Sequence, residues 1–237
     1  MATFKAIVTG HTQGLGAAIA AELMTKGIPV LGLARGHSSA TTQQVALDLG
    51  SSRHLQDWLA GPQLAAFLGD AEIALLINNA GVVQPVGALT DQDPAQLALS
   101  VALNVAAPLM LSAAVARIMQ GRASRILHIS SGAGRSAYPG WSVYCATKAA
   151  LDHHARAVAL DAVPGLRVCS LAPGLINTGM QAQIRETSVE RFPMRQRFVE
   201  LKESGALVSP EVCARGVVAY LLADQFGAKP VDDLRSA

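Results

Sequence analysis

The sequence is poor in cysteine, in charge and in aromatic residues. Its three cysteines, Cys145, Cys169 and Cys213, are odd in number, far apart and in no CxxC spacing, which argues against a disulfide framework or a zinc site. We therefore expect a reducing compartment, the cytoplasm. Charged residues make up 15% of the chain and the formal net charge is +2, with Lys and Arg scattered along the sequence. Such a chain offers no basic surface for nucleic acid or for an anionic membrane.

Targeting segments and long hydrophobic runs are also lacking. The apolar stretch FKAIVTG starts at Phe4 and leaves no room before it for the three regions of a signal peptide. Later apolar runs are interrupted by Gly, Pro or charge before they reach the length of a bilayer span, so we expect no membrane-spanning helix. His153 and His154 have no metal-ligand partner at a useful spacing, and we expect no bound metal.

The hydrophobic residues, 51% of the chain, gather in short runs. Five of these runs have the length and continuous apolar character of buried strands, and helix-compatible segments separate them. They are FKAIVT (4–9), IPVLGLA (28–34), AEIALLIN (71–78), SRILHIS (124–130) and LRVCSLA (166–172). Buried strands joined by helices form a parallel sheet that is covered on both faces. The sequence therefore predicts a single α/β domain over residues 1–237, a doubly wound Rossmann-like fold.

Three weaker signals complete the predicted fold. QQVALDL (43–49) is a candidate for an additional strand, third in chain order. Ser209 and Pro210 have the residue types of a helix N-cap and first helical position, which predicts a helix over SPEVCARGVVAYLLA. Residues 175–205 are more polar than their surroundings and follow a strand end. In doubly wound sheets such a segment covers the ligand crevice, so we expect these residues to cover the substrate.

A glycine cluster lies between the first predicted strand and the first helix. Gly10, Gly14 and Gly16 permit a tight turn, a close approach of backbone N–H groups to a pyrophosphate, and close packing of helix on strand. The strand, turn and helix context favours a dinucleotide site. The alternative is a glycine-rich turn without a ligand.

Tyr144 and Lys148 lie four positions apart on a predicted helix and therefore share one face. A free phenol has a pKa of about 10, so a tyrosine that exchanges protons at neutral pH needs a nearby positive charge. Ser131, thirteen residues before the tyrosine, ends a predicted strand and is placed to hydrogen-bond a carbonyl oxygen that becomes negative. Ser130 is the alternative serine.

The motifs TGxxxGxG, NNAG, Ser131, YxxxK and LAPGLINT follow one another in an order that resembles the short-chain dehydrogenase/reductase family over nearly the whole chain. The resemblance implies hydride transfer from a reduced nicotinamide to a carbonyl, with Tyr144 as the acid, Lys148 as its electrostatic partner and Ser131 orienting the carbonyl. It also implies that Asn104 binds a water that relays protons from the lysine. A core asparagine that ties two backbone segments is the alternative.

The resemblance further assigns the cofactor residues. Arg35 stands where an acidic residue would bind the ribose hydroxyls, and an arginine there favours a 2′-phosphate, hence NADP. Gln13, however, stands where NADP users of the family often have a second basic residue. Asp48 either accepts a bond from the adenine amine or caps a turn. The full expected set is Gly10, Thr12, Gly14, Leu15, Gly16, Arg35, Asp48, Leu49, Asn79, Ala80, Gly81, Tyr144, Lys148, Pro173, Gly174, Ile176 and Thr178.

The segment after LAPGLINT is similar to that of sepiapterin reductases and of bacterial relatives that reduce one carbonyl of a 1,2-diketone. This likeness implies that Asp232 anchors the substrate. Besides Ser131, which faces the carbonyl, Tyr138 and Trp141 are candidate substrate residues, because they lie between Ser131 and Tyr144 and would line an apolar pocket. Tyr138 and Trp141 serve equally well as packing residues, and Asp233 is reachable by a shift of one residue from Asp232. The chain lacks the DGG ending that is common in the wider family.

Two other functions share most of these features. A secondary-alcohol dehydrogenase would use the same residues in the oxidative direction, and a cofactor sensor would bind NADP without chemistry. The presence of Ser131, Tyr144, Lys148 and Asn104 together argues against the sensor, which has no need of a proton circuit. The family resemblance also implies a homodimer or homotetramer built through the helices that contain Asn104 and Tyr144.

Overall fold

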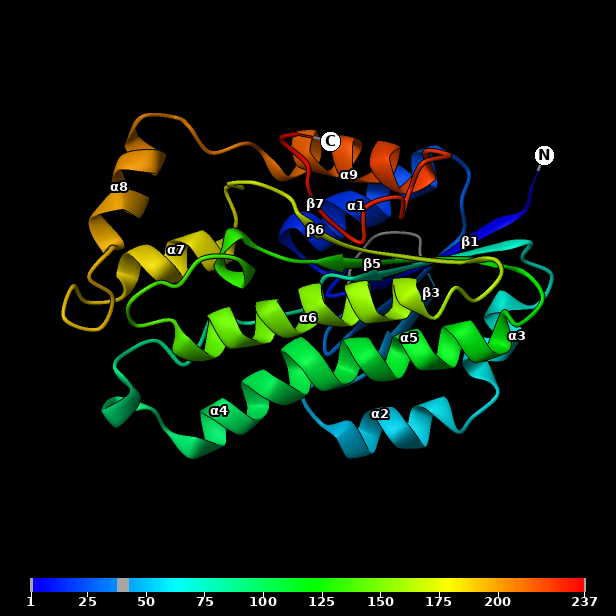
Figure 1. Ribbon diagram of the computed structural model, residues 1–237, viewed down its shortest axis with the longest axis horizontal. Coiled ribbons are helices and arrows are strands. Elements are labelled where there is room, and N and C mark those ends of the chain that lie inside the picture. The colour runs from blue at the N-terminus through cyan, green and yellow to red at the C-terminus, as the bar shows by residue number, and fades with distance from the viewer. Residues whose placement is uncertain (1, 38–42, 237) are drawn as a thin grey trace.

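A computed structural model of the chain describes residues 2–37 and 43–236, and Figure 1 shows a central sheet between two layers of helices. The seven strands are parallel and lie in the order β3-β2-β1-β4-β5-β6-β7. Their bounds are β1 Phe4–Thr9, β2 Val30–Ala34, β3 Gln43–Ala46, β4 Ile73–Asn78, β5 Ala123–Ile129, β6 Leu166–Ala172 and β7 Val231–Asp233. The predicted doubly wound α/β fold is confirmed.

The helices are divided between the two faces of the sheet (Figure 1). One face carries α1 (Gly14–Thr25) and α9 (Pro210–Leu222), which contact each other. The other face carries α2 (Ser52–Leu59), α3 (Gln63–Leu68), α4 (Pro94–Val101), α5 (Ala107–Ile118) and α6 (Ser142–Leu160). Beyond one end of the sheet lie α7 (Gly179–Glu186) and α8 (Arg195–Glu203). Short helical turns are η1 (Leu89–Asp91), η2 (Ala102–Ala106) and η3 (Gly132–Gly134).

Burial on both faces explains why the strands are apolar throughout. Along β1, for example, Val8 belongs to the hydrophobic cluster under α1 and α9, while Ile7 belongs to the cluster under α5 and α6. Both side chains are fully buried, as is Leu76 of β4 beside them in the register. Each such side chain contributes roughly 1.5–3 kcal/mol to folding, so the sheet centre is the most strongly stabilised part of the molecule.

The direction in which strands are added reverses between β1 and β4, which are neighbours in the sheet. The chain builds β1, β2 and β3 in one direction and then β4 to β7 in the other. The loops that leave the carboxyl ends of β1 and β4 therefore diverge, and in doubly wound sheets the ligand crevice lies between such loops. Gly10 follows β1 directly and Asn79 follows β4 directly, so both motifs lie at this crevice.

The five strong strand predictions are confirmed, and the weaker one is confirmed for Gln43–Ala46. The helix opened by Ser209 is also confirmed, because the Ser209 hydroxyl accepts the N–H of Val212 and Pro210 is the first helical residue. Strand β7 was not predicted. It has three residues, two of them aspartates, and aspartate is disfavoured in strands, so no local pattern marks it.

The expectation that no apolar run reaches bilayer length is wrong for residues 94–118. Helices α4 and α5 and the turn η2 form one apolar helix of 25 residues, Pro94–Ile118, that is long enough to cross a membrane by length and composition. Pro108 does not break it, because η2 is a π-helical turn just before the proline, where the α-helical bonding pattern is already interrupted. In this fold α5 packs on β4 and β5 as a core helix.

Candidate active site

The glycine turn after β1 leaves space that no larger residue could leave. Gly10 and Gly14 have positive φ angles of 67° and 55°. A Cβ atom on Gly16 would lie 2.2 Å from the carbonyl oxygen of Gly10 and 2.4 Å from Nδ2 of Asn79. Helix α1 therefore begins in direct contact with the ends of β1 and β4.

The N-terminus of α1 is suited to an anion. Gln13 occupies the N-cap position without a side-chain hydrogen bond to the helix, and the first turn of α1 contains no acidic residue. The first N–H groups of a helix without a capping side chain are free to bind a phosphate. Thr178, which precedes α7, lies beside this turn, with its Cγ2 3.6 Å from the Cβ position of Gly14. These residues fit the pyrophosphate of a dinucleotide.

Thr9 fastens the β4 end to the glycine turn. Its hydroxyl accepts the N–H groups of Asn79 and Ala80, both at 2.9 Å, and Nδ2 of Asn79 donates to the carbonyl of Thr9, also at 2.9 Å. Sequence reasoning missed Thr9, because a threonine inside an apolar run reads as a strand residue. Gly81 follows, and its Cβ position lies 3.1 Å from Oδ1 of Asn104 and 3.9 Å from Nζ of Lys148. The predicted cofactor and catalytic segments thus meet here.

Tyr144, Lys148 and Ser131 come together as the spacing predicts. Nζ of Lys148 lies 5.7 Å from the centroid of the Tyr144 ring and donates to the carbonyl of Ile129 at 2.8 Å. The hydroxyl of Ser131, two residues beyond the end of β5, accepts the N–H of Ala133 at 3.2 Å and is close enough to Tyr144 to lower the pKa of the phenol. Ser130 instead donates to Asp152, which leaves Ser131 as the serine on the tyrosine side.

Burial governs the protonation of the pair. Tyr144 is 7% exposed and Lys148 5%. Burial raises the pKa of Tyr144 to about 12, against the opposing hydrogen bond of Ser131. Burial lowers the pKa of Lys148 to about 8, against the opposing charge of Asp152. At neutral pH the phenol is therefore protonated and the amine charged. In this structure burial outweighs the lowering of the phenol pKa that we expected from Lys148.

Asn104 lies in the π-helical turn η2 and is 1% exposed. Its amide group accepts the N–H of Val82 at 2.9 Å and donates to the carbonyl of Val82 at 2.8 Å. It also donates to the hydroxyl of Thr147 on α6 at 3.2 Å. These bonds correspond to the alternative that we considered, a core asparagine that ties segments together. The proton relay through Asn104 stays a prediction.

Arg35 and Asp48 lie at the far end of the crevice from Tyr144. Arg35 follows β2 directly and is exposed, and within residues 2–37 and 43–236 its guanidinium forms no ion pair. Oδ1 of Asp48 accepts the N–H of Gly50 at 3.0 Å, the geometry of a turn aspartate. Leu49, which lies between Asp48 and Gly50 in the sequence, is buried. This bond uses only one of the two carboxylate oxygens of Asp48. The predicted contact of Asp48 with the adenine amine therefore stays a prediction.

The segment after β6 supplies the remaining predicted cofactor residues. Pro173 and Gly174 turn the chain at the strand end, with a positive φ of 90° at Gly174. Ile176 is buried and pairs with Val208 in an isolated bridge. Thr178 is the N-cap residue of α7 and lies next to Gly14, so the segment reaches from the end of β6 to the glycine turn.

The predicted substrate residues Tyr138 and Trp141 belong to an apolar cluster between the catalytic helix and residues 175–205. Trp141 is 4% exposed, stacks on Phe192 at 4.5 Å between ring centroids and meets Phe198 edge-on at 5.5 Å. Its ring also lies 5.5 Å from that of Tyr138 and 5.3 Å from that of Tyr144. Phe192 and Phe198 were not predicted, because nothing in a variable polar segment marks which aromatic residue turns inward.

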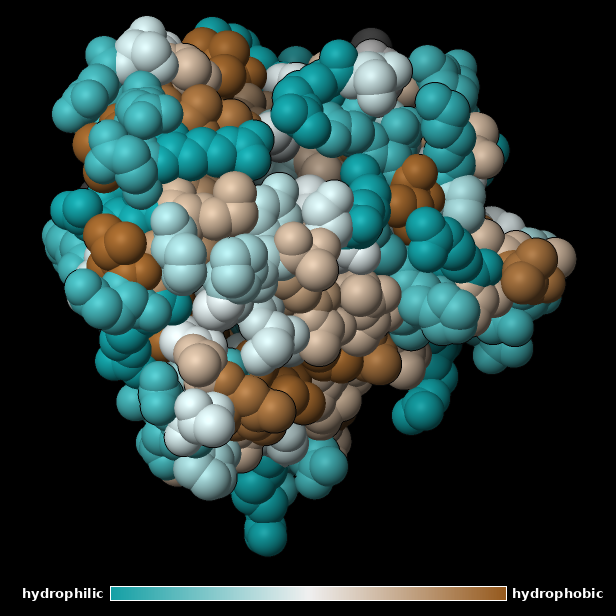
Figure 2. Space-filling model, turned by 60° about the vertical axis from the view of Figure 1, so that its left-hand side comes forward, coloured by the Kyte–Doolittle hydropathy of each residue, from teal (hydrophilic) through white to brown (hydrophobic). Residues whose placement is uncertain are grey.

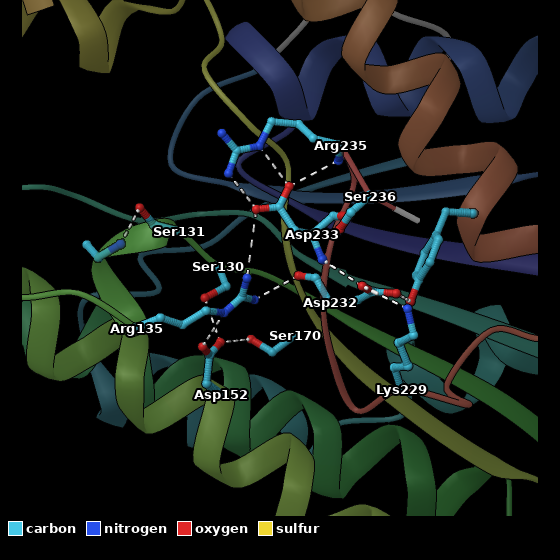
Figure 3. Close-up of polar contacts among 12 residues, drawn as sticks. Ser130, Ser131, Arg135, Asp152, Ser170, Lys229, Asp232, Asp233, Arg235 and Ser236 are labelled. Carbon is cyan, nitrogen blue, oxygen red and sulfur yellow. Dashed lines mark hydrogen bonds and ion pairs between the residues drawn. The ribbon is translucent and has the colours of Figure 1, made fainter.

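Asp232 lies in β7 at the sheet edge (Figure 3), where its carboxylate accepts the Tyr220 hydroxyl at 3.1 Å. Asp233, the neighbour considered as its alternative, holds Arg235 through two bonds of 2.9 and 2.6 Å. Both carboxylates thus have protein partners in this structure. Their contact with a substrate stays a prediction.

A doubly wound parallel sheet with an open helix N-terminus at its switch point, and with a buried tyrosine and lysine and a half-buried serine beside it, defines a Rossmann-type oxidoreductase. Comparison with known proteins agrees. Residues 5–189 match the family model described as short chain dehydrogenase. The chain is 32% identical to a benzil reductase ((S)-benzoin forming) of Bacillus cereus, over 93% of this chain and 94% of that protein.

Two further relatives cover the chain as fully. A sepiapterin reductase of Meriones unguiculatus is 32% identical over 93% of this chain and 92% of its own length. A crystal structure of a short-chain dehydrogenase/reductase from Burkholderia vietnamiensis is 45% identical, with a TM-score of 0.70 over 99% of this chain and 100% of that one. The chain therefore belongs to the short-chain dehydrogenase family of oxidoreductases.

Gly16→Ala should abolish dinucleotide binding, because the added methyl group would overlap the Gly10 carbonyl and push α1 away from the sheet. Gly179→Ala is the control, since a Cβ at this helical position meets no described atom within 4 Å. Binding is measured by fluorescence of the reduced nicotinamide. Wild-type affinity in Gly16→Ala would contradict the assignment of the pocket to this turn.

Proposed function

We propose that the protein is an NADPH-dependent carbonyl reductase. The observation that supports it most directly is the arrangement of the buried Tyr144 and Lys148 with the half-buried Ser131 at the carboxyl edge of the sheet, next to a glycine turn that fits a dinucleotide. A nicotinamide dinucleotide supplies hydride chemistry when it is bound there. The three free cysteines favour the reducing cytoplasm as its compartment.

The residues of the chain provide the acid. Ser131 and the Tyr144 hydroxyl converge on the position of a carbonyl oxygen, which they stabilise as its negative charge grows. Tyr144, protonated because burial raises its pKa to about 12, donates its proton to that oxygen. The Lys148 ammonium, 5.7 Å from the ring, then stabilises the resulting phenolate. The geometry suits reduction at neutral pH, where both groups carry their protons.

The proposed substrate is a 1,2-diketone or a sepiapterin-like ketone. Relatives named benzil reductase and sepiapterin reductase support this class. Tyr138 also supports it, because its partly exposed ring lies at the edge of the buried cluster of Trp141 and Phe192 beside Tyr144 and offers an apolar surface to a planar aromatic ketone.

Purified protein should oxidise NADPH with benzil or sepiapterin, and Tyr144→Phe should lower kcat by about 10²- to 10⁴-fold while NADPH still binds, because the variant lacks only the acidic proton. Trp58→Phe on α2, a half-buried aromatic residue whose ring N–H bonds Gln63, is the control and should keep wild-type turnover. The turnover of both variants is measured as the loss of NADPH absorbance. Full activity of Tyr144→Phe would overturn the mechanism, whereas NADPH binding without turnover in the wild type on any carbonyl or alcohol would favour the cofactor sensor.

Arg35→Ala should raise the KM for NADPH about tenfold or more and leave the KM for NADH unchanged, because charge-assisted hydrogen bonds to the 2′-phosphate are lost. Arg53→Ala, which removes an exposed arginine on α2, is the control. Initial rates at varied NADPH and at varied NADH give the two KM values for each variant. Equal use of NADH and NADPH by the wild type would remove the basis for NADP.

We further propose a homodimer or homotetramer built through α4, α5 and α6. The exposed apolar side chains of α4 are Leu97, Leu99 and Val101, and small exposed residues follow on the neighbouring helices, such as Ala113 on α5. Figure 2 shows hydrophobic side chains gathered in the lower part of one face, within a mostly hydrophilic rim. Apolar and small residues on adjoining helices suit close packing against a second copy.

Ala113→Arg should therefore shift the protein to monomer, because a charged side chain would enter the interface between helices. Ala21→Arg, an exposed position on α1 across the sheet, is the control and should leave assembly unchanged. Sedimentation velocity measures the mass of each variant. A wild-type protein that sediments as a monomer would exclude this assembly.

A further inference from the structure

A buried carboxylate lies one helical turn beyond Lys148 on α6. Asp152 is 1% exposed, yet its Oδ1 accepts the hydroxyls of Ser130 and Ser170, both at 2.7 Å. Its Oδ2 accepts Nε of Arg135 at 3.2 Å. Figure 3 shows these groups converging on Asp152 from β5, from β6 and from the loop after η3.

The same helix holds the end of β5 at two successive residues. Lys148 donates to the carbonyl of Ile129, and Asp152 accepts the hydroxyl of Ser130. Ser131 is the next residue, and its backbone then leads through η3 to Arg135, which Asp152 also binds. The chain on both sides of Ser131 is therefore fixed to the helix that carries Tyr144.

We propose that Asp152 is a positioning residue of the reductase, which holds Ser131 and Lys148 in the geometry required for proton transfer through its bonds to Ser130, Ser170 and Arg135. It touches neither the substrate nor the reacting atoms and acts through these neighbours. The inference rests on the proposed function, because the geometry that it maintains is that of the carbonyl site.

A purely structural role does not account for a charge at this position. A buried ionised carboxylate costs free energy unless it is paired and hydrogen-bonded, and an apolar residue of similar volume often stabilises a core as well or better. Here two of the three bonds of Asp152 are made to residues on either side of Ser131, and the third is made to Ser170 on β6, the strand beside β5. Arg135 extends the connection to the chain end, because it donates to the carbonyl of Asp232 at 2.7 Å and lies 3.9 Å from Asp233.

The charge of Asp152 also supports the charged form of Lys148. Around the lysine, the titratable groups are Tyr144 and Asp152 on α6 and His128 on β5, whose pKa burial lowers to about 3, so that it stays neutral. Asn104 and Gly81, which face Lys148 from η2 and from the loop after β4, carry no charge. Arg135, beyond Asp152, partly offsets its charge. Removal of the carboxylate therefore lowers the pKa of Lys148 below its present value of about 8.

Asp152→Asn tests the proposal. Its amide oxygen can still accept the two serine hydroxyls, but an N–H pair replaces Oδ2 and faces the Nε–H of Arg135, so two donors oppose each other. We expect kcat to fall roughly 10- to 100-fold while the dissociation constant for NADPH is unchanged, because only the alignment of the acid is disturbed. The alkaline limb of the kcat profile should move to lower pH, since the ammonium form of Lys148 is lost earlier.

A readout independent of turnover is the titration of Lys148 in the protein without cofactor. Lys148 is one of five lysines, so isotope-labelled lysine gives few nuclear magnetic resonance signals, and Lys148→Met assigns the one of interest. The pKa of Lys148 should be lower in Asp152→Asn than in the wild type. Asp161→Asn, the same change at the exposed C-cap of α6, is the matched control and should alter neither kcat nor this titration.

Arg135→Gln is a second variant that tests the proposal if Asp152→Asn fails to fold. We expect it to fold, because Arg135 is partly exposed and Asp152 stays bonded to both serines in its absence. It should lower kcat with unchanged NADPH binding and should raise the pKa of Lys148, since Asp152 then acts on the lysine without its counter-charge. Wild-type kcat and wild-type Lys148 titration in the folded variants would overturn the proposal. Absence of turnover in the wild type would overturn the proposed function instead and would leave the titration as the test of Asp152.

Discussion

The close approach of α1 to the sheet is the constraint on which the rest of the site depends. At Gly16 the helix backbone lies so near the end of β1 that one methyl group would overlap the Gly10 carbonyl. This contact fixes where the helix N-terminus points, and through Asn79 it also fixes the end of β4. The strand order reverses between β1 and β4 at that point, so the free N–H groups of α1 face the place where doubly wound sheets bind their ligands.

A second constraint, the burial of ionisable groups on α6, determines the chemistry. Burial moves the pKa values of Tyr144 and Lys148 in opposite directions, to about 12 and about 8, yet at neutral pH both groups keep their protons. The phenol is then a proton donor beside a cation that stabilises its conjugate base. Asp152, which opposes the effect of burial on the lysine, allows the amine to be buried and still be charged. Burial alone would lower the pKa of Lys148 further. The carboxylate of Asp152, one turn further along α6, raises that pKa and so opposes the effect of burial.

The sequence predicted those parts that depend on short spacings. Continuous apolar runs predicted the strands, because burial on both faces leaves a local pattern, and YxxxK predicted a shared helix face, because the helical period fixes it. It failed where the cause is a distant partner. Asp152 reads as a solvent-facing residue of a helix, Thr9 as an ordinary strand residue, and the bonds that give them a role come from segments that the topology brings close. Pro108 misled for a related reason, since η2 lets the helix continue through it.

The catalytic groups and the substrate wall obey different physical rules, and this difference bears on what the family resemblance can tell. Lys148, beside Tyr144, is held by a directed hydrogen bond to the Ile129 carbonyl on β5, and Ser131 accepts the N–H of Ala133; directed bonds of this kind tolerate little displacement. Trp141 and Phe192 meet by stacking, which tolerates exchange among apolar side chains of similar volume. In the proposed reductase, the reaction type is therefore constrained by residues that a motif records, whereas we expect the choice of carbonyl to depend on how α7, α8 and the segment between them pack against Trp141. A substitution at Phe192 should thus change which ketone is accepted before it changes how the proton is delivered.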